Sequence, residues 1–398
     1  MMAAITAAGQ GAEVTLLEPN ERLGKKLNIT GKGRCNVTNC AGRETLLENV
    51  AKNGKFLYSA FSSFDGRDTM AFFEKLGVPL KVERGNRVFP VSDRAFDISG
   101  ALERRMRALH VRWVRDRACV LLIDDTGAAA GVSGEKGSYS ADAVILATGG
   151  VSYPATGSTG DGYRMAQEAG HTVVPPVASL VPLVSPDTCC KAMQGLALKN
   201  IQLTVRDRKN RKVFEDFGEL LFTHFGVSGP LILSASAHLR DFETNQYTLS
   251  IDLKPALDEK KLELRVLRDM EERKNQSVSA LVGGLVPHSM IPILIEKCGL
   301  DGNTKVHSIT KEQRRKIEYT LKHFTVSVTG TRPVEEAIVT SGGIRINEIN
   351  PTTMESKRVK SLYFAGEIID ADAYTGGFNL QIAWATGRAA GLSAAKTE

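Results

Sequence analysis

The apolar positions of the chain follow helical and strand periods in alternation, which predicts a mixed α/β protein. Short apolar runs at 14–17, 143–146 and 362–365 are long enough for buried strands, and each ends at an acidic or glycine-bearing turn. After Gly376-Gly377, apolar and small residues recur at helical spacing from Phe378 onward. Strands that alternate with helices in this way are typical of the open, Rossmann-like α/β folds that bind dinucleotides.

The segment 361–391 has the chemistry expected of a flavin site. Its helix begins with unpaired N–H groups and the positive end of the helix dipole, which suit the negative N1–C2 edge of a reduced flavin. Glu367 follows Gly366 at the end of the strand, where its carboxylate can accept hydrogen bonds from a ribityl chain. An ordinary strand–loop–helix with a solvated Glu367 explains this segment alone equally well.

The first 18 residues predict the second half of a dinucleotide-binding βαβ unit. Residues 1–8 favour a helix, 14–17 a strand, and Glu18 then stands where such units place the acid that binds the adenosine ribose. That acid lies about 20 residues after a glycine fingerprint, so we expect the glycine loop and first strand to lie upstream of this chain. An ordinary N-terminal helix followed by a surface acid is the alternative.

Two glycine-bearing loops are candidate ligand contacts. The loop LGKKLNITGKGRCNVTN (23–39) carries Lys25, Arg34 and a Gly-x-Gly, and such loops bind phosphate or flavin carbonyls through backbone N–H and guanidinium groups. A solvated basic turn is the alternative. The run VILATGG breaks at Thr148-Gly149-Gly150, at the strand end where open α/β folds place their ligand.

A change of pattern near 174–176 indicates a domain boundary. We expect a discontinuous dinucleotide-binding domain (1–175 and 335–398) and an inserted domain at 176–334, β-rich at 176–255 and 320–334 and helical at 256–319. His224 in the insert and Tyr374 beside the paired glycines are the candidate proton donors. A structural histidine and a gating or packing tyrosine are the alternatives.

Composition narrows the class of protein. At 398 residues the chain is too long to fold around a single hydrophobic core, so we expect two or three domains. A net charge of +6 permits an anionic cofactor but does not indicate nucleic-acid binding. The six cysteines show no CxxC and no zinc spacing, so we expect a reducing, cytoplasmic location and no metal. The start lacks a signal-peptide n-region, and no run of about 18 uncharged apolar residues exists, so no membrane partner is expected. The oligomeric state is left open.

Seven stretches, spread along nearly the whole chain, resemble the BaiN/YhiN-like flavoproteins, FAD-dependent oxidoreductases related to the glutathione-reductase superfamily. They are LGKKLNITGKGRCNVTN, RVFPVSD, ILATGG, TGSTGDGY, GELLFTHFGVSGP, AIVTSGGIRINEINPTTMESK and LYFAGEIIDADAYTGGFNLQIAWATGRAAG. The resemblance implies a split FAD domain with the insert on the substrate side. The residues it implies are Glu18 at the adenosine ribose; Arg34, Cys35 and Asn36 in the flavin-side loop; Ala147, Thr148 and Gly149 at the second approach to the dinucleotide; Glu367 at the ribityl chain; and Gly377, Asn379, Leu380 and Gln381 at the helix start under the flavin.

The family carries a first strand and GxGxxG-type loop before the segment that matches residues 1–4, and roughly 13–15 such residues are absent here. We expect the chain as written to bind FAD poorly and a version extended upstream to bind it well. Equal FAD retention by the two would contradict this.

The function expected from the resemblance is hydride transfer through flavin N5 to a small or steroid-like organic substrate. No second glycine fingerprint follows a strand, so NAD(P)H is expected to dock only transiently as reductant. A flavin-dependent tRNA-modifying enzyme and a non-catalytic flavin-binding redox sensor are the alternatives. A tRNA enzyme needs a concentrated basic face with aromatics. The basic runs 104–117 and 206–212 read better as a helix–strand surface and a hairpin turn, so no nucleic-acid partner is expected.

Overall fold

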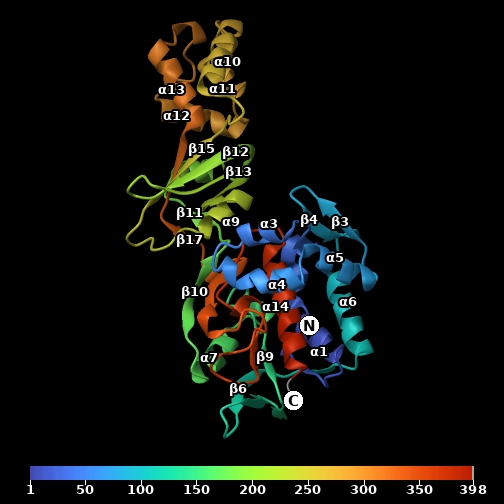
Figure 1. Ribbon diagram of the computed structural model, residues 1–398. Helices are drawn as coiled ribbons and strands as arrows, with labels where there is room; N and C mark the ends of the chain where they lie inside the picture. Colours follow the sequence, from blue (N-terminus) through green and yellow to red (C-terminus); the bar gives the residue numbers. More distant parts are fainter. Residues whose placement is uncertain (397–398) are drawn as a thin grey trace. The chain divides into compact units, whose positions relative to one another are not determined.

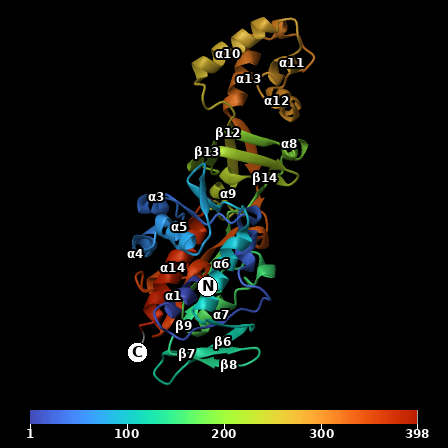
Figure 2. The ribbon, with the colours of Figure 1, turned by 90° about the vertical axis from the view of Figure 1, so that its right-hand side faces the viewer.

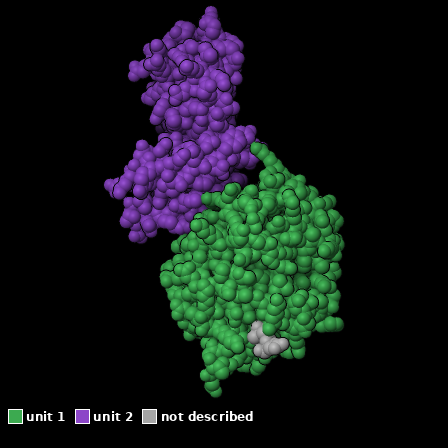
Figure 3. Space-filling model, in the orientation of Figure 1, with its two compact units in different colours: residues 1–179, 333–398 green, residues 180–332 purple. Residues whose placement is uncertain are grey.

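The computed structural model describes residues 1–396, and the chain divides into two compact units (Figure 3). Unit 1 holds residues 1–179 and 333–398, and unit 2 holds residues 180–332. The insert thus begins four residues later, and ends two residues earlier, than the expected 176–334. The cause is strand β10 (Val173–Ser179), which pairs antiparallel with β18 (Val339–Ile344) as far as Ser179. The prolines at 175–176 therefore mark a bulge within a strand, where ladder donors are missing, and not a domain boundary.

Unit 1 is built around two parallel strand pairs. β1 (Thr15–Leu17) pairs with β5 (Arg112–Val114), and β9 (Val144–Leu146) pairs with β19 (Leu362–Phe364). An antiparallel meander of β6 (Ala118–Ile123), β7 (Ala129–Gly134) and β8 (Ser138–Ser140) leads into β9. A third sheet has the order β2 (Thr38–Asn39), β4 (Arg87–Pro90), β3 (Leu80–Glu83). The α/β alternation expected from the sequence is present.

The long C-terminal helix α14 (Phe378–Ala394) is the central helix of unit 1, with α1 (Met2–Ala8) packed along it (Figure 1). Small and apolar residues bury it on most sides, and the indole of Trp384 donates to the Val37 carbonyl (2.8 Å). The other helices of this unit are α2 (Lys25–Ile29), α3 (Arg43–Glu48), α4 (Tyr58–Ser63), α5 (Gly66–Lys75), α6 (Ala95–Ala108) and α7 (Asp161–Glu168).

Unit 2 is an antiparallel sheet with a helical part, as its alternating and then helical patterns indicate. The sheet order is β16 (Phe324–Val328), β15 (Tyr247–Asp252), β12 (Ala197–Arg206), β13 (Lys212–Thr223), β14 (Gly226–Ser228), β11 (Leu183–Val184), β17 (Gly330–Thr331). Two helices, α8 (Thr188–Ala192) and α9 (Pro230–Ser236), lie beside the sheet. Figure 2 shows α10 (Glu259–Glu272), α11 (Val278–Gly283), α12 (Ile291–Cys298) and α13 (Lys311–Lys322) gathered at one end of it. Along residues 1–396, no helix combines the length and apolar character that a bilayer crossing requires.

Candidate functional site

The start of α14 lies directly against the donor-rich loop at 23–39. With its amide oriented to satisfy its neighbours, Asn36 accepts a hydrogen bond from the Gly377 N–H (3.0 Å). Asn39 donates from Nδ2 to the Gly376 carbonyl (3.2 Å). Two segments more than 300 residues apart in sequence therefore meet at the turn that begins the helix.

Close backbone contact makes this turn specific for glycine. Gly377 has φ +97°, and a Cβ there would lie 2.4 Å from the carbonyl of Thr38. Gln381 is the first helical residue to donate back into the turn, to the Gly377 carbonyl (3.0 Å). The N–H groups of 378–380 have no partner within the helix, and Asn379 and Leu380 are only half-buried. This end of α14 can therefore present amides and a positive dipole to an anionic ligand edge.

The ends of β9 and β19 form the second side of the site. The strands are parallel, and the Ala365 N–H donates to the Leu146 carbonyl (3.1 Å), so both chains leave the sheet side by side. Ala147 is exposed immediately after fully buried Leu146. The hydroxyl of Thr148 is buried and has no hydrogen-bond partner among the described residues. Gly149, which follows, is half-buried.

Glu367 stands just after β19 and is held by three groups. Its Oε2 accepts from Lys26 Nζ (2.7 Å), and its Oε1 accepts from the Thr340 N–H (2.8 Å) and lies 3.4 Å from Ser152 Oγ. Gly366, before it, donates its N–H to Thr386 Oγ1 of α14 (2.9 Å). Sequence reasoning named Lys25 and missed Lys26, because two adjacent lysines give no signal of which one faces the carboxylate.

Glu18 lies at the end of β1, as expected, and its carboxylate already has a protein partner. Its Oε1 accepts from Asn20 through the backbone N–H (3.0 Å) and Nδ2 (2.7 Å). Asn20 also donates to the Thr156 carbonyl (2.9 Å) and accepts from exposed Lys25 (3.4 Å). Asn20, which the sequence did not single out, links β1 to the glycine-rich loop at 156–160.

Several side chains expected at the ligand instead support the protein. Gln381 is fully buried; its Oε1 accepts from the hydroxyls of Thr38 (2.6 Å) and Thr69 (2.8 Å), and its Nε2 donates to the Phe64 carbonyl (2.8 Å). Asn379 exchanges hydrogen bonds with the backbone of Ala373 (2.9 and 2.7 Å). Both side chains are held within the protein, and their expected place beneath the flavin stays a prediction.

The side chains of Arg34 and Cys35 are also committed within the protein. The Arg34 guanidinium pairs with Glu83 and Asp93 and stacks over Phe89 (4.1 Å), which holds it on the β3–β4 hairpin. Cys35 is fully buried, and burial raises the pKa of its thiol to about 12, so it remains a neutral thiol. The Arg34 guanidinium thus anchors the loop, and its expected contact with a ligand stays a prediction.

The two candidate proton donors lie in different units. Tyr374 is half-buried in unit 1, and its N–H donates to the Asn49 carbonyl (2.9 Å) just before the paired glycines. His224 is exposed on the β13–β14 turn of unit 2, edge-on to Phe225 at 5.0 Å. The structure thus brings Tyr374 to the start of α14, and the role of His224 stays a prediction.

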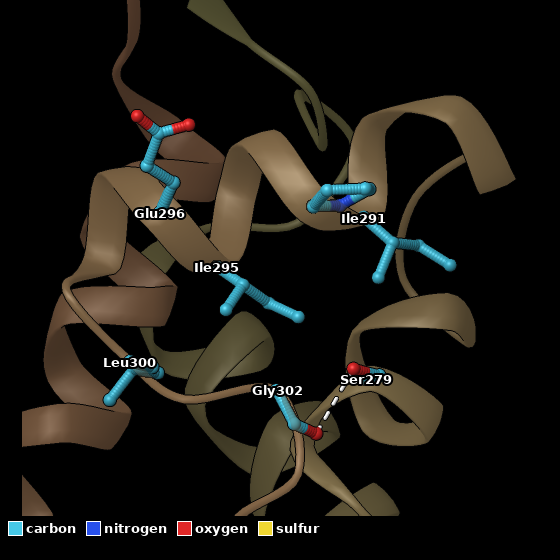
Figure 4. A pocket seen from close by; sticks show the side chains of 7 residues that line it. Ser279, Ile291, Ile295, Glu296, Leu300 and Gly302 are labelled. Carbon is cyan, nitrogen blue, oxygen red and sulfur yellow. Dashed lines mark hydrogen bonds between the residues drawn. The ribbon is translucent and has the colours of Figure 1, made fainter.

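A shallow hollow of about 430 Å³ lies in the helical part of unit 2 (Figure 4). Ile291, Ile295 and Leu300 line it together with Ser279 and Glu296. None of the residues expected to bind cofactor or substrate lines it, so it is not the candidate site.

The residues around α14 fit a flavin dinucleotide. Acids stand at two strand ends, free amides begin the helix, and the orphaned Thr148 hydroxyl lies beside the β9 turn. In this arrangement Glu18 would bind the adenosine ribose and Glu367 the ribityl chain, while the amides of 378–380 would face the negative flavin edge.

Comparison with known proteins shows the family to which the chain belongs. The family described as "HI0933-like protein Rossmann domain" matches residues 1–393. The chain is 31% identical to a 3-dehydro-bile acid delta(4,6)-reductase of Clostridium scindens, with 100% of this chain and 96% of the relative aligned. It is 29% identical to a ribosomal RNA dihydrouridine synthase of Escherichia coli, with 95% and 91% aligned.

A solved structure shows the same fold. The 3-ketosteroid-delta4-(5alpha)-dehydrogenase of Rhodococcus jostii RHA1 superposes with a TM-score of 0.51 at 16% identity, over 99% of this chain and 94% of that chain. The family resemblance read from the seven sequence stretches is confirmed. The chain belongs to the HI0933-like Rossmann family and is an FAD-dependent oxidoreductase.

Proposed function

We propose that the protein reduces a carbon–carbon double bond conjugated to a carbonyl group. The names of the two relatives share this chemistry. A 3-dehydro-bile acid with double bonds at positions 4 and 6 is a conjugated dienone, and uridine becomes dihydrouridine when the ring bond next to a carbonyl is saturated. The primary candidate substrate for this chain is a small or steroid-like enone.

The observation that carries the proposal is the meeting of Asn36 and Asn39 with the Gly376-Gly377 turn, which presents the first amides of α14 beside the β9 and β19 ends. When bound there, FAD supplies hydride from N5, with NAD(P)H as the proposed reductant. The amides of 378–380 stabilise negative charge on the ligand edge that faces them. Glu18 and Glu367 orient the bound molecule through its hydroxyl groups.

The substrate takes hydride at the carbon β to its carbonyl and a proton at the α carbon, so the double bond is saturated. A nearby acid must supply that proton. We propose Tyr374 for this role because it precedes the paired glycines within unit 1. Replacing Tyr374 with Phe should lower kcat by about 10²-fold while FAD affinity is retained. A kcat equal to that of the parent enzyme would assign Tyr374 to packing.

A uridine base in RNA is the second candidate substrate, and the distribution of charge favours it. Unit 2 carries 23 Lys and Arg against 18 Asp and Glu, a formal charge of +5, whereas unit 1 carries 28 against 27. Arg208 and Lys209, at the exposed tip of the β12–β13 hairpin, make no side-chain hydrogen bond or ion pair with any described residue. A basic surface of this kind attracts the phosphate backbone.

One anaerobic experiment tests both substrates. The FAD-loaded protein is reduced with NADPH or NADH, mixed with either a 3-oxo-Δ4 steroid or ribosomal RNA, and monitored by the flavin absorbance. Reoxidation by the steroid, with the saturated ketone as product, supports the enone proposal, and reoxidation by RNA with dihydrouridine as product supports the second candidate. A reduced flavin that neither compound reoxidises would overturn the proposed reaction class.

A further inference from the structure

We propose that Lys26 is a positioning residue of the FAD site, which orients Glu367 and balances its charge. Lys26 was not among the residues expected from the sequence. The inference rests on the placement of FAD at the start of α14 and is independent of which double bond the enzyme reduces.

Lys26 joins segments that are distant in sequence. Its Nζ donates to Glu367 Oε2 and to Ser152 Oγ, both at 2.7 Å. The second oxygen of Glu367 accepts from the Thr340 N–H at 2.8 Å. Groups from three segments therefore contact the carboxylate: Lys26 of α2, Ser152 in the loop after β9, and Thr340 of β18.

The surroundings leave this carboxylate little freedom on its protein side. Ser152 and Thr340 are buried, and the Val151 N–H donates to Thr340 Oγ1 (2.9 Å). A Cβ on Gly150 would lie 2.9 Å from Glu367 Oε1, so that side is closed by backbone. The Lys26 and Glu367 side chains nevertheless keep 24% and 20% of their surface exposed. The carboxylate is thus fixed from within while one side stays accessible to a ligand.

The adjacent lysine does not duplicate this role. Successive helical residues point about 100° apart, and the exposed side chain of Lys25 reaches Asn20 Oδ1 (3.4 Å). Through Asn20 it borders Glu18, at the opposite strand pair. Of the two lysines of α2, Lys26 contacts a carboxylate and Lys25 contacts the amide of Asn20.

The positive charge of Lys26 should also affect how easily the bound flavin is reduced. Without its cation, Glu367 would present an uncompensated negative charge beside a flavin that becomes anionic on reduction. Like charges in a poorly solvated site repel strongly. Loss of Lys26 should therefore make bound FAD harder to reduce, and should also weaken binding because the acceptor carboxylate can rotate.

The test compares apoprotein affinity for FAD and the midpoint potential of the bound flavin in Lys26→Met, Lys26→Arg and the parent. We expect Lys26→Met to raise the FAD dissociation constant about tenfold, as for the loss of one charge-assisted hydrogen bond. It should also lower the midpoint potential, and Lys26→Arg should restore much of both. Combining Lys26→Met with Glu367→Gln should return the potential toward that of Glu367→Gln alone, because no unpaired charge remains.

Lys322→Met in unit 2 is the matched control, since Lys322 also pairs with a carboxylate, that of Asp252, at 2.5 Å and is similarly buried. We expect it to lower the unfolding temperature without moving the flavin potential. If Lys26→Met folds poorly, Ser152→Ala removes one contact of Lys26 without changing charge, and a smaller rise in the dissociation constant is expected.

An unchanged potential and dissociation constant in Lys26→Met, with only a lower unfolding temperature, would overturn the inference and assign Lys26 to stability alone. If the parent apoprotein binds FAD too weakly to compare the variants, the same substitutions are made in a version extended upstream, and failure of that version to take up FAD would overturn both this inference and the cofactor site. A parent that binds and reduces FAD normally but saturates no enone or uridine would overturn the proposed function and leave the role of Lys26 standing.

Discussion

A buried polar cluster shows how single side chains stabilise unit 1. His171 contacts Glu348 Oε2 through Nδ1 (3.2 Å) and Ser356 Oγ through Nε2 (2.9 Å). Burial lowers the pKa of His171, against the opposing effect of Glu348, so the imidazole is neutral, with Nδ1–H donating to Glu348 and Nε2 accepting from Ser356. Burial raises the pKa of Glu348, but hydrogen bonds from Arg358 and Thr172 outweigh it and bring that pKa to about 2.

These shifts predict acid sensitivity. A carboxyl whose folded pKa lies below its ordinary 4.5 contributes stability that is complete above that value and is lost as the pH falls toward about 2. The lowered pKa of His171 acts in the same direction. Glu348→Gln should lower the free energy of unfolding by about 2 kcal/mol at neutral pH, with the deficit shrinking in acid. Urea unfolding at several pH values measures this, and a deficit independent of pH would contradict it.

We expect substitution of Gln381 to lower the stability of the fold, because its amide makes hydrogen bonds with two hydroxyls and one carbonyl in the core. Replacing it with Leu removes the donor of the Phe64 carbonyl and leaves the Thr69 and Thr38 hydroxyls only the carbonyls of Asp65 (3.0 Å) and Asn39 (3.4 Å). The substitution should cost about 2 kcal/mol of unfolding free energy. Thr69→Val, which removes only one partner, should cost less. Thermal unfolding of the apoproteins measures whether Gln381→Leu costs more stability than Thr69→Val. A variant that loses only FAD affinity would indicate that the Gln381 side chain contacts the ligand.

Among the elements, the start of α14 is sensitive to backbone change. Gly377→Ala places a Cβ against Thr38 in a left-handed conformation, which should cost about 1–3 kcal/mol and displace the turn. FAD retention after gel filtration should fall. Gly387→Ala, in the same helix, is the matched control, since its Cβ would meet Met2 Cβ at an ordinary 3.4 Å. Equal FAD retention in the two variants would show that the turn does not hold the cofactor.

Arg34 adds ion pairs to the β2–β4 pairing that attaches the β3–β4 hairpin to the 23–39 loop. Arg34→Met removes the ion pairs with Glu83 and Asp93, and because these groups are partly exposed the loss of global stability should be small. We expect faster amide hydrogen exchange at 80–93. Unchanged exchange together with a strong loss of FAD would instead restore the guanidinium to the ligand.

For the molecule as a whole, the uneven charge predicts where RNA would bind. Arg208→Glu combined with Lys209→Glu should weaken RNA binding and flatten its salt dependence, while steroid reduction is retained. Arg104→Glu with Arg105→Glu, on exposed α6 of unit 1, makes the same change in net charge as a control. Equal losses in the two variants would indicate a general charge effect and no specific surface.

The apolar runs and paired glycines were sufficient to predict β9, β19 and the start of α14, because buried parallel strands and helix starts leave local patterns. The same patterns could not show that Arg34 turns toward Glu83, or that Gln381 points into the core. Those outcomes depend on partners 49 and more than 300 residues away, whose proximity no local period records.

The local sequence pattern was therefore sufficient to predict the alternation of helices and strands, the family motifs and the segments proposed to approach the cofactor. Packing alone assigned Lys26 to Glu367 and Lys25 to Asn20, although the two lysines are neighbours of identical chemistry. The reason is geometric. Adjacent helical residues face different directions, and which of the two meets a carboxylate is settled only when the fold brings α2 to Glu367, 341 residues along the chain.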